Sequence, residues 1–174
     1  MKANDIYTLL GLITRSHADE TLDQQRIRTG LSISSIHRSL KSLKKAKLVI
    51  ETVNGNEPIY RNIKEFLLHG FSYVFPEEKG KLARGFVTGI DASSLKYDFA
   101  LSDYPVVWAH PEGDTKGYSV KPLNTDCLEL IVLHKMDEKL YELLALLDIL
   151  RIGQRREIEG AKSKINEILD NYEQ

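Results

Sequence analysis

The stretch between Leu31 and Val49 contains polar side chains whose types and order suit contact with a nucleic acid. Short hydroxyl side chains come first, cations follow, and no carboxylate stands among them. Hydroxyl and guanidinium groups can bond to base edges, and ammonium groups can neutralise phosphates. The alternative is an ordinary solvent-facing helix, since lysines near a helix C-terminus also complement its dipole. The polar residues are Ser34, Ser35, His37, Arg38, Lys41, Ser42, Lys44 and Lys45.

The spacing of apolar residues predicts that residues 32–46 form a helix. Ser32 is a favourable N-cap, because its hydroxyl can accept a hydrogen bond from an amide of the first turn. Apolar residues at intervals of three and four share one face of such a helix, and that face must be buried. These residues are Ile33, Ile36, Leu40 and Leu43.

The segments on either side of this helix complete a recognisable order of elements. We expect a first helix over residues 3–16, a second from Thr21 to about Arg28, and a break at Gly30. Extended runs over residues 48–53 and 58–63 surround Asn54-Gly55, which is a strong hairpin signal. Two helices, a turn, a helix and a hairpin are the order of a winged helix.

The segment from Thr21 to Arg61 resembles the winged-helix domains of bacterial regulators of the MarR group. The resemblance lies in the Gly-apolar-Ser turn, the apolar positions of the following helix, and the LysLysAlaLysLeuVal that ends at Val49. One departure is that Gln25 and Arg26 replace an apolar residue and an alanine. Either the second helix has a shifted register, or Arg26 turns outward to phosphate.

The resemblance implies that some residues of this segment contact DNA bases and others contact phosphates. Arg38 is the best candidate for guanine, because its guanidinium can donate to both O6 and N7. The base contacts implied are Ser34, Ser35, His37 and Arg38. The phosphate contacts implied are Arg26, Lys41, Ser42, Lys44, Lys45, Lys47 and Arg61. The tip of the wing has no arginine for a minor groove, and Glu57 would be repelled there.

The net charge of −1 conceals an uneven distribution. Residues 1–64 contain eleven lysines and arginines against six acidic residues, a net charge of +5 that leaves −6 for the remainder. A basic surface gains affinity for nucleic acid by releasing counterions. The N-terminal third is therefore the expected contact region.

Composition favours a cytoplasmic globular protein. Hydrophobic residues make up 42% of the chain and charged residues 28%, which is ordinary for a soluble domain. A single cysteine, Cys127, excludes an internal disulfide framework and fits a reducing compartment. We expect no membrane partner, because no apolar run reaches membrane-spanning length and no secretion signal opens the chain.

Residues 65–125 are expected to form short strands and loops, because proline and glycine interrupt them repeatedly. A helix over residues 62–75 is expected at the start of this region, and the interruptions run from Pro76 to Pro122. The extended runs 106–108 and 118–120 predict a β-hairpin or an ordered surface loop between them.

Two clusters in this middle region are candidate ligand sites. Lys79, Lys81 and Arg84 could bind an anion, but their spacing matches neither a P-loop nor a dinucleotide motif. His110, Glu112 and Asp114 could form a metal site. The stronger interpretation of these three residues is a turn exposed to solvent. We expect no metal and no cofactor.

The C-terminal residues 126–174 are expected to be helical. A helix that opens near Glu138 and ends at Gly153 has an apolar arc too wide for one contact face, which favours burial in a core or in a dimer interface. The dimer hypothesis places Leu140, Leu143, Leu144 and Leu147 in that interface. Cys127 could be a peroxide-sensing thiol, although a buried core cysteine is the commoner case.

Together these patterns predict an α+β, mainly α, protein. It would have a winged-helix DNA-binding domain at residues 1–64, a loop-rich middle at 65–125 and C-terminal helices at 126–174. The function expected is sequence-specific binding of double-stranded DNA by a homodimeric repressor and not catalysis. One alternative is an antitoxin-like module that neutralises a protein partner and regulates its own promoter. Another, an enzyme acting on a phosphorylated substrate, would use the glycine-punctuated middle.

Overall fold

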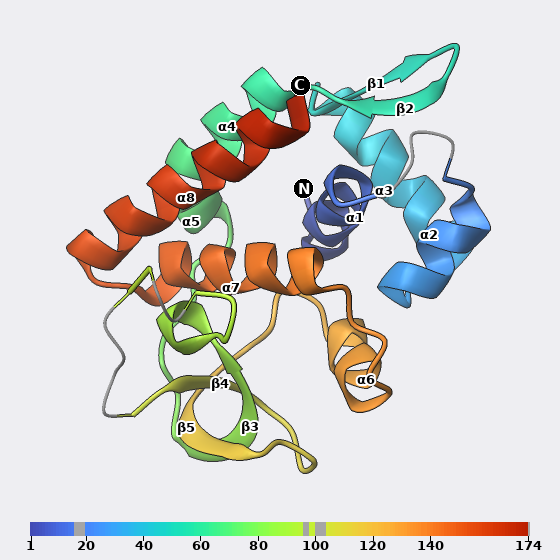
Figure 1. Ribbon diagram of the computed structural model, residues 1–174. Coiled ribbons are helices and arrows are strands. Elements are labelled where there is room, and N and C mark those ends of the chain that lie inside the picture. The colour runs from blue at the N-terminus through green and yellow to red at the C-terminus, as the bar shows by residue number, and fades with distance from the viewer. Residues whose placement is uncertain (16–19, 96–97, 100–103, 174) are drawn as a thin grey trace.

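The computed structural model describes residues 1–15, 20–95, 98–99 and 104–173, and the fold is α+β with helices predominant (Figure 1). The helix α7 crosses the centre of the molecule, with a small sheet and α6 on one side and α1, α3, α4 and α8 on the other. In chain order the elements are α1 (Ala3–Ile13), α2 (Leu22–Thr29), α3 (Ile33–Lys45), β1 (Val49–Thr52), β2 (Gly55–Pro58), α4 (Tyr60–His69), α5 (Phe71–Val74), β3 (Leu82–Thr88), the 3-10 turn η1 (Gly89–Asp91), β4 (Val106–Ala109), β5 (Thr115–Val120), α6 (Asp126–Val132), α7 (Glu138–Ile152) and α8 (Arg155–Glu173).

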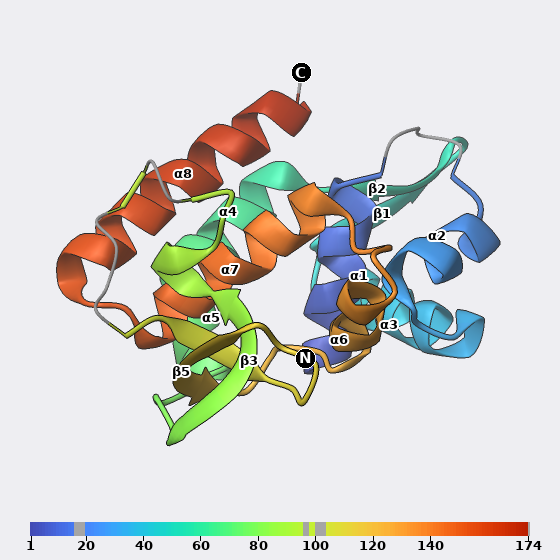
Figure 2. The same ribbon diagram turned by 60° about the horizontal axis from the view of Figure 1, so that its bottom comes forward.

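The helix α2 begins and ends at residues that suit those positions. Thr21 and Gln24 form a reciprocal capping box at the start of α2, where the Gln24 amide donates to Thr21 Oγ1 over 3.3 Å and the Thr21 amide donates to Gln24 Oε1 over 2.8 Å. Gly30 ends α2 with a φ of 75°, a conformation that favours glycine. The helix α1 lies between α3 and α7 (Figure 2) and ends at Ile13, before residue 16 of the expected range, which lies outside the described residues.

The hairpin after α3 is shifted from the expected register. Thr52 pairs with Gly55, so Val53 and Asn54 form its two-residue turn. The Thr52 hydroxyl stabilises this earlier turn by accepting from the Asn54 amide and donating to the Gly55 carbonyl, both over 3.2 Å. The prediction of a strand over residues 58–63 is wrong, because Pro58 ends β2 and α4 starts at Tyr60. The helix expected over 62–75 is divided into α4 and α5.

The strands β3, β4 and β5 form a closed three-stranded sheet. The strand β3 is antiparallel to both others, and β4 and β5 are parallel to each other. Of the two alternatives expected between residues 106 and 120, the hairpin is therefore wrong, and a loop with a turn connects the two strands. Closure requires close approach of backbones at Gly85 and Gly113. A Cβ on Gly85 would lie 2.1 Å from the Trp108 carbonyl oxygen, and one on Gly113 would lie 2.2 Å from the Gly85 backbone.

Most of the α7 helix is buried by the chain itself, while Glu138 and Lys139 of its first turn remain exposed. It contacts α1, α5, α8, η1 and β3. The four leucines assigned to a dimer interface are at most 2% exposed, so that assignment is wrong: they complete the core of one chain and are not accessible to a second copy. These are Leu140, Leu143, Leu144 and Leu147.

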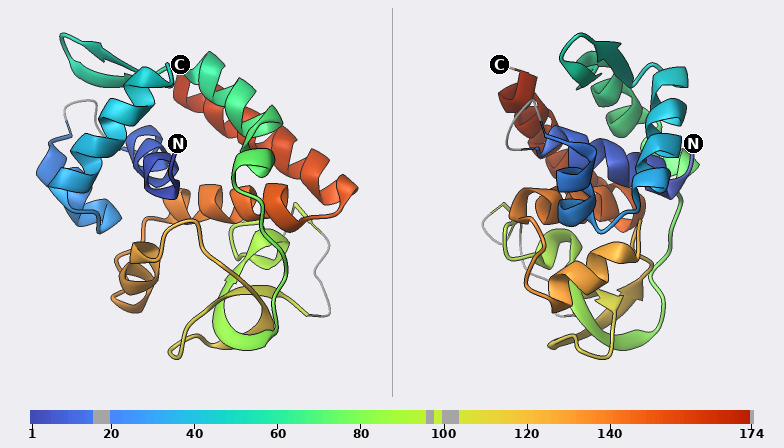
Figure 3. Two further views of the ribbon diagram at one scale, coloured as in Figure 1. Left: turned by 180° about the vertical axis from the view of Figure 1, so that it is seen from behind. Right: turned by 90° about the vertical axis from the view of Figure 1, so that its right-hand side faces the viewer.

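One hydrophobic core runs through all three expected segments. Buried side chains of α1, α3, the small sheet, α7 and α8 belong to a single cluster. The helices α4 and α8 lie side by side on its outer surface (Figure 3). The boundaries expected near residues 64 and 125 therefore do not separate independent cores. Within the residues that the structure describes, none of the helices has the length and apolarity required to cross a bilayer.

Candidate nucleic-acid interface

The exposed face of α3 begins at a capped helix terminus. Ser32 Oγ accepts a hydrogen bond from the Ser35 amide over 3.2 Å, as expected for an N-cap. The buried side consists of Ile36, Ser39, Leu40 and Leu43. Ile33, which we expected to be buried, remains 39% exposed because it lies in the first turn. The opposite side presents Ser34, His37, Arg38, Lys41 and Lys45 to solvent.

Arg38 is held along the surface of α3 without being buried. Its Nε donates to the Ser34 carbonyl and its Nη2 donates to Ser35 Oγ, each over 3.3 Å. Both hydrogen bonds are long and exposed, and water or a base edge could replace them at little cost. The structure thus brings together three of the four residues expected to contact bases. The fourth, His37, is exposed one residue before Arg38.

A hollow of about 550 Å³ adjoins this face. It lies between α2, α3 and the β1–β2 hairpin. Its lining combines cations and polar groups with two leucines at its base. The lining residues are Leu22, His37, Arg38, Leu40, Lys41, Lys44, Glu51 and Asn56.

Four of the expected phosphate contacts have free side chains. Lys41, Lys45, Lys47 and Arg61 are exposed, and none forms a side-chain hydrogen bond or ion pair with the residues that the structure describes. Lys47 has a φ of 58°, which turns the chain from α3 into β1. The side chain of Asn62 stabilises this turn by donating to the Lys47 carbonyl over 2.7 Å.

The other three expected phosphate contacts have partners within the chain. Lys44 pairs with Glu51 of β1 over 2.5 Å, which holds the hairpin against α3 and lowers the pKa of Glu51 through that hydrogen bond. Arg26 turns outward and pairs with Asp23 over 2.8 Å. The Ser42 assignment is wrong, because this half-buried hydroxyl faces α1 and donates to Asp5 Oδ2 over 2.8 Å.

Arg15 is a residue of this region that sequence reasoning missed. Its guanidinium pairs with Glu57 over 2.5 Å and donates to the Asn56 carbonyl over 3.1 Å, which ties β2 to the end of α1. Glu57 is therefore not a free charge at the tip of the hairpin. Gln25, the other departure from the MarR pattern, is buried and directs its amide toward the Thr8 carbonyl over 3.4 Å. No sequence signal pointed to either contact, because the partners are distant along the chain.

The weaker candidate sites of the middle region do not gather into a ligand set. Lys79, Lys81 and Arg84 are exposed, and Arg84 donates to the Gly113 carbonyl over 3.1 Å. His110 stacks on Phe86 with ring centroids 5.3 Å apart and accepts from the Glu112 amide. Among the described residues, no three His, Cys, Asp or Glu side chains lie close enough to hold a metal ion.

Cys127 is a buried thiol at the start of α6. It donates to the Asn124 carbonyl over 2.8 Å, and burial, with smaller contributions from Asp148 and Asp126, raises its pKa to about 12. A peroxide-sensing thiol requires the opposite, an accessible thiolate.

Comparison of the chain with protein-family models, with curated proteins and with solved structures finds no match. Function is therefore inferred from the geometry and charge of the α3 face.

Proposed function

We propose that this protein binds double-stranded DNA in a sequence-specific manner and acts as a transcriptional regulator in the cytoplasm, most simply as a repressor. The elements α1 to β2 would serve as a winged helix of the MarR type, with α3 in the major groove. The single observation that carries this proposal is the exposed, carboxylate-free face of α3, where Ser34 and Arg38 precede Lys41 and Lys45.

The charges around α3 support a groove-binding role. Arg38 can exchange its two long hydrogen bonds for guanine O6 and N7, and the free lysines can neutralise phosphates on either side. Among the described residues that line the hollow, Glu51 is the acidic one, and it is neutralised by Lys44. The remaining side of α3 is fixed by burial, so the polar face is presented by a rigid element.

A homodimer would let two copies of α3 read half-sites about one turn of DNA apart. Because α7 is buried in each chain, the dimer contact would have to use another surface.

The test is a gel-shift titration of the full chain against duplex from its own upstream region and a scrambled duplex, over a salt series. We expect tighter binding to the upstream duplex and a steep loss of affinity with salt. The double variant K41Q/K45Q should flatten the salt dependence. A matched control is K162Q on α8, which removes the same type of charge far from α3 and should leave the slope unchanged. Equal slopes for the two variants would overturn the proposal.

A second candidate, the antitoxin-like module, is favoured by one specific observation. Three large side chains on the outside of the small sheet are exposed together: Leu82 is 46% exposed and faces Tyr118 in the strand register, and the Tyr104 ring lies edge-on to Tyr118 with centroids 6.0 Å apart. Tyrosine is enriched in protein interfaces. Purification from the native host should then yield a stoichiometric protein partner that the variant Y104A/Y118A loses.

A further inference from the structure

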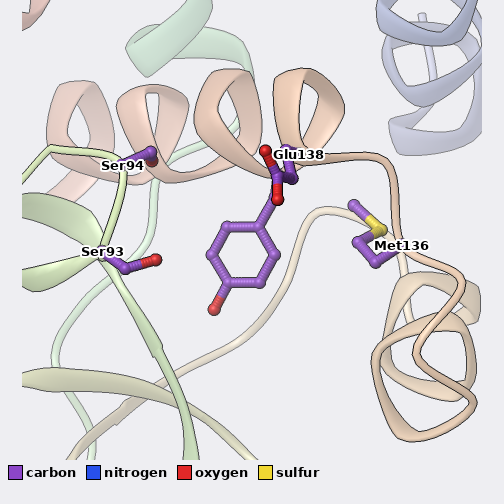
Figure 4. Close-up of a pocket in the computed structure, with 5 residues that line it drawn as sticks. Ser93, Ser94, Met136 and Glu138 are labelled. Carbon is purple, nitrogen blue, oxygen red and sulfur yellow. The ribbon is translucent and has the colours of Figure 1, made fainter.

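A second concave site, separate from the α3 face, lies beside the start of α7 (Figure 4). It has a volume of about 340 Å³, within the range of small-molecule sites. Ser93 and Ser94, which follow η1, lie on one side of it, and Met136 and Glu138 lie toward the start of α7 (Figure 4). Tyr141 completes the described lining.

The Tyr141 ring is fixed before any ligand binds. Its hydroxyl donates to the Val87 carbonyl of β3, and its ring packs against Trp108 with centroids 5.1 Å apart at 51°. The side chain is only partly buried, so part of the ring still faces the cavity. A ring held at both its hydroxyl and one side loses little entropy when a ligand packs against it.

The groups around this ring are electron-rich. Glu138 carries the only charge among the described lining residues, and the others contribute two hydroxyls and a thioether. Burial, followed by the neighbouring charges of Cys127, Asp114 and Asp148, raises the pKa of Tyr141, which therefore stays neutral. The described lining residues thus favour a cation over an anion at this ring.

The start of α7 does not make this cavity an anion site. A free helix N-terminus would attract anions through its unpaired amides. Here Asp137 caps the helix and accepts from the Leu140 amide over 2.8 Å, and Glu138 adds a second negative charge in the first turn. The nearby cation Lys139 lies over the Tyr172 ring, 5.7 Å from its centroid.

We propose that this cavity binds a small organic ammonium ion. The cation would lie against the Tyr141 ring, within reach of the Glu138 carboxylate, and the hydroxyls of Ser93 and Ser94 would bond to the polar end of the ligand. This inference goes beyond the proposed DNA binding and does not depend on it.

The test uses choline as the probe and its neutral carbon isostere, in which a quaternary carbon replaces the nitrogen. Calorimetric titration of the full chain should show saturable binding of choline, about ten-fold tighter than binding of the isostere, as expected for a cation over an aromatic ring beside a carboxylate. Absence of saturable choline binding would overturn the proposal, and so would equal affinities for the two probes.

Three variants test whether choline binds in this cavity. E138Q changes an exposed side chain and should weaken choline binding about five-fold while leaving the isostere unaffected. The matched control E129Q removes an exposed carboxylate of α6 outside the cavity and should change neither titration. Y141F retains the ring and loses only the bond to Val87, so it should fold and retain most of the selectivity for the cation. Equal effects of E138Q and E129Q on choline binding would place the ligand elsewhere and overturn the proposal.

Discussion

Trp108 Nε1 donates a hydrogen bond of 2.6 Å to Asp148 Oδ2, and both side chains are only 1% exposed. The same carboxylate oxygen accepts from Thr88 Oγ1 over 2.8 Å, and the other oxygen accepts from Arg151 Nη1 over 2.8 Å. Through these bonds one carboxylate on α7 joins two strands of the small sheet to the central helix. A buried charge with this many donors is stable only while all of them are present.

The variant D148A should therefore lower the free energy of unfolding by about 3–5 kcal/mol, because it leaves the buried Trp108 N–H and Thr88 hydroxyl without their acceptor and removes one of the two carboxylates that pair with Arg151. Chemical denaturation with urea measures this. The control D170N removes a carboxylate that pairs with Lys64 at the surface, and it should cost less than about 1 kcal/mol. If both variants unfold at the same urea concentration, the carboxylate does not have the stabilising role given to it here.

R38A should weaken binding to a cognate duplex by about 1–3 kcal/mol and should leave binding to random duplex almost unchanged. The reason is that Arg38 would read a base, while the neighbouring lysines contact phosphates. The unfolding free energy should stay within about 0.5 kcal/mol of the wild type, since the side chain is exposed. Fluorescence anisotropy with both duplexes measures the difference. An equal loss on random DNA would show that Arg38 contacts only the backbone.

E51Q should increase affinity for DNA and steepen its salt dependence. The change removes a negative charge beside the α3 face and frees Lys44 from its 2.5 Å ion pair, which adds one phosphate contact. Gel shifts at two salt concentrations check this prediction. E57Q is the informative comparison, because Glu57 holds Arg15 at the base of the hairpin and lies outside the hollow. Tighter binding by E57Q alone would contradict the assignment of Lys44.

Cys127 should react slowly with alkylating reagents in the folded protein. With a pKa of about 12 in place of 9.0, the thiolate fraction at pH 8 falls about a thousand-fold, and burial slows reaction further. Mass spectrometry after iodoacetamide treatment, with and without urea, measures the protection. Rapid alkylation of the folded chain would contradict this prediction and would again support a redox-sensing role for this thiol.

The same raised pKa makes stability depend on alkaline pH. The unfolded chain releases the thiol proton near pH 9.0, and the folded chain keeps it until about pH 12. The folded state therefore binds more protons than the unfolded state between these two pH values. The contribution of the Cys127 thiol to stability is lost as pH rises through this window. The urea midpoint of the wild type should fall more between pH 8 and pH 10.5 than that of C127A. Parallel falls would show that the thiol does not titrate in this way.

The sequence by itself determined the elements whose signals are local. Ser32, Gly30 and the capping box at Thr21 fix where α2 and α3 begin and end through bonds within a few residues, so they could be read directly. The free cations of α3 were predicted for the same reason, since helical spacing alone places Lys41 and Lys45 away from the buried leucines. The helical character of residues 138–152 also followed from composition.

Tertiary structure decided what those elements face. The wide apolar arc of α7 suits a dimer interface and a monomer core equally, and only the packing of α1, α8 and the small sheet around it selects the core. The strand β3 was not predicted because Gly85 interrupts its apolar pattern. Closure of the sheet requires a glycine at this position. The role of Ser42 was predicted wrongly because its partner Asp5 lies 37 residues away along the chain. Arg15 was missed because its partner Glu57 lies 42 residues away. Contacts of that range depend on how the whole chain packs, and no local spacing encodes them.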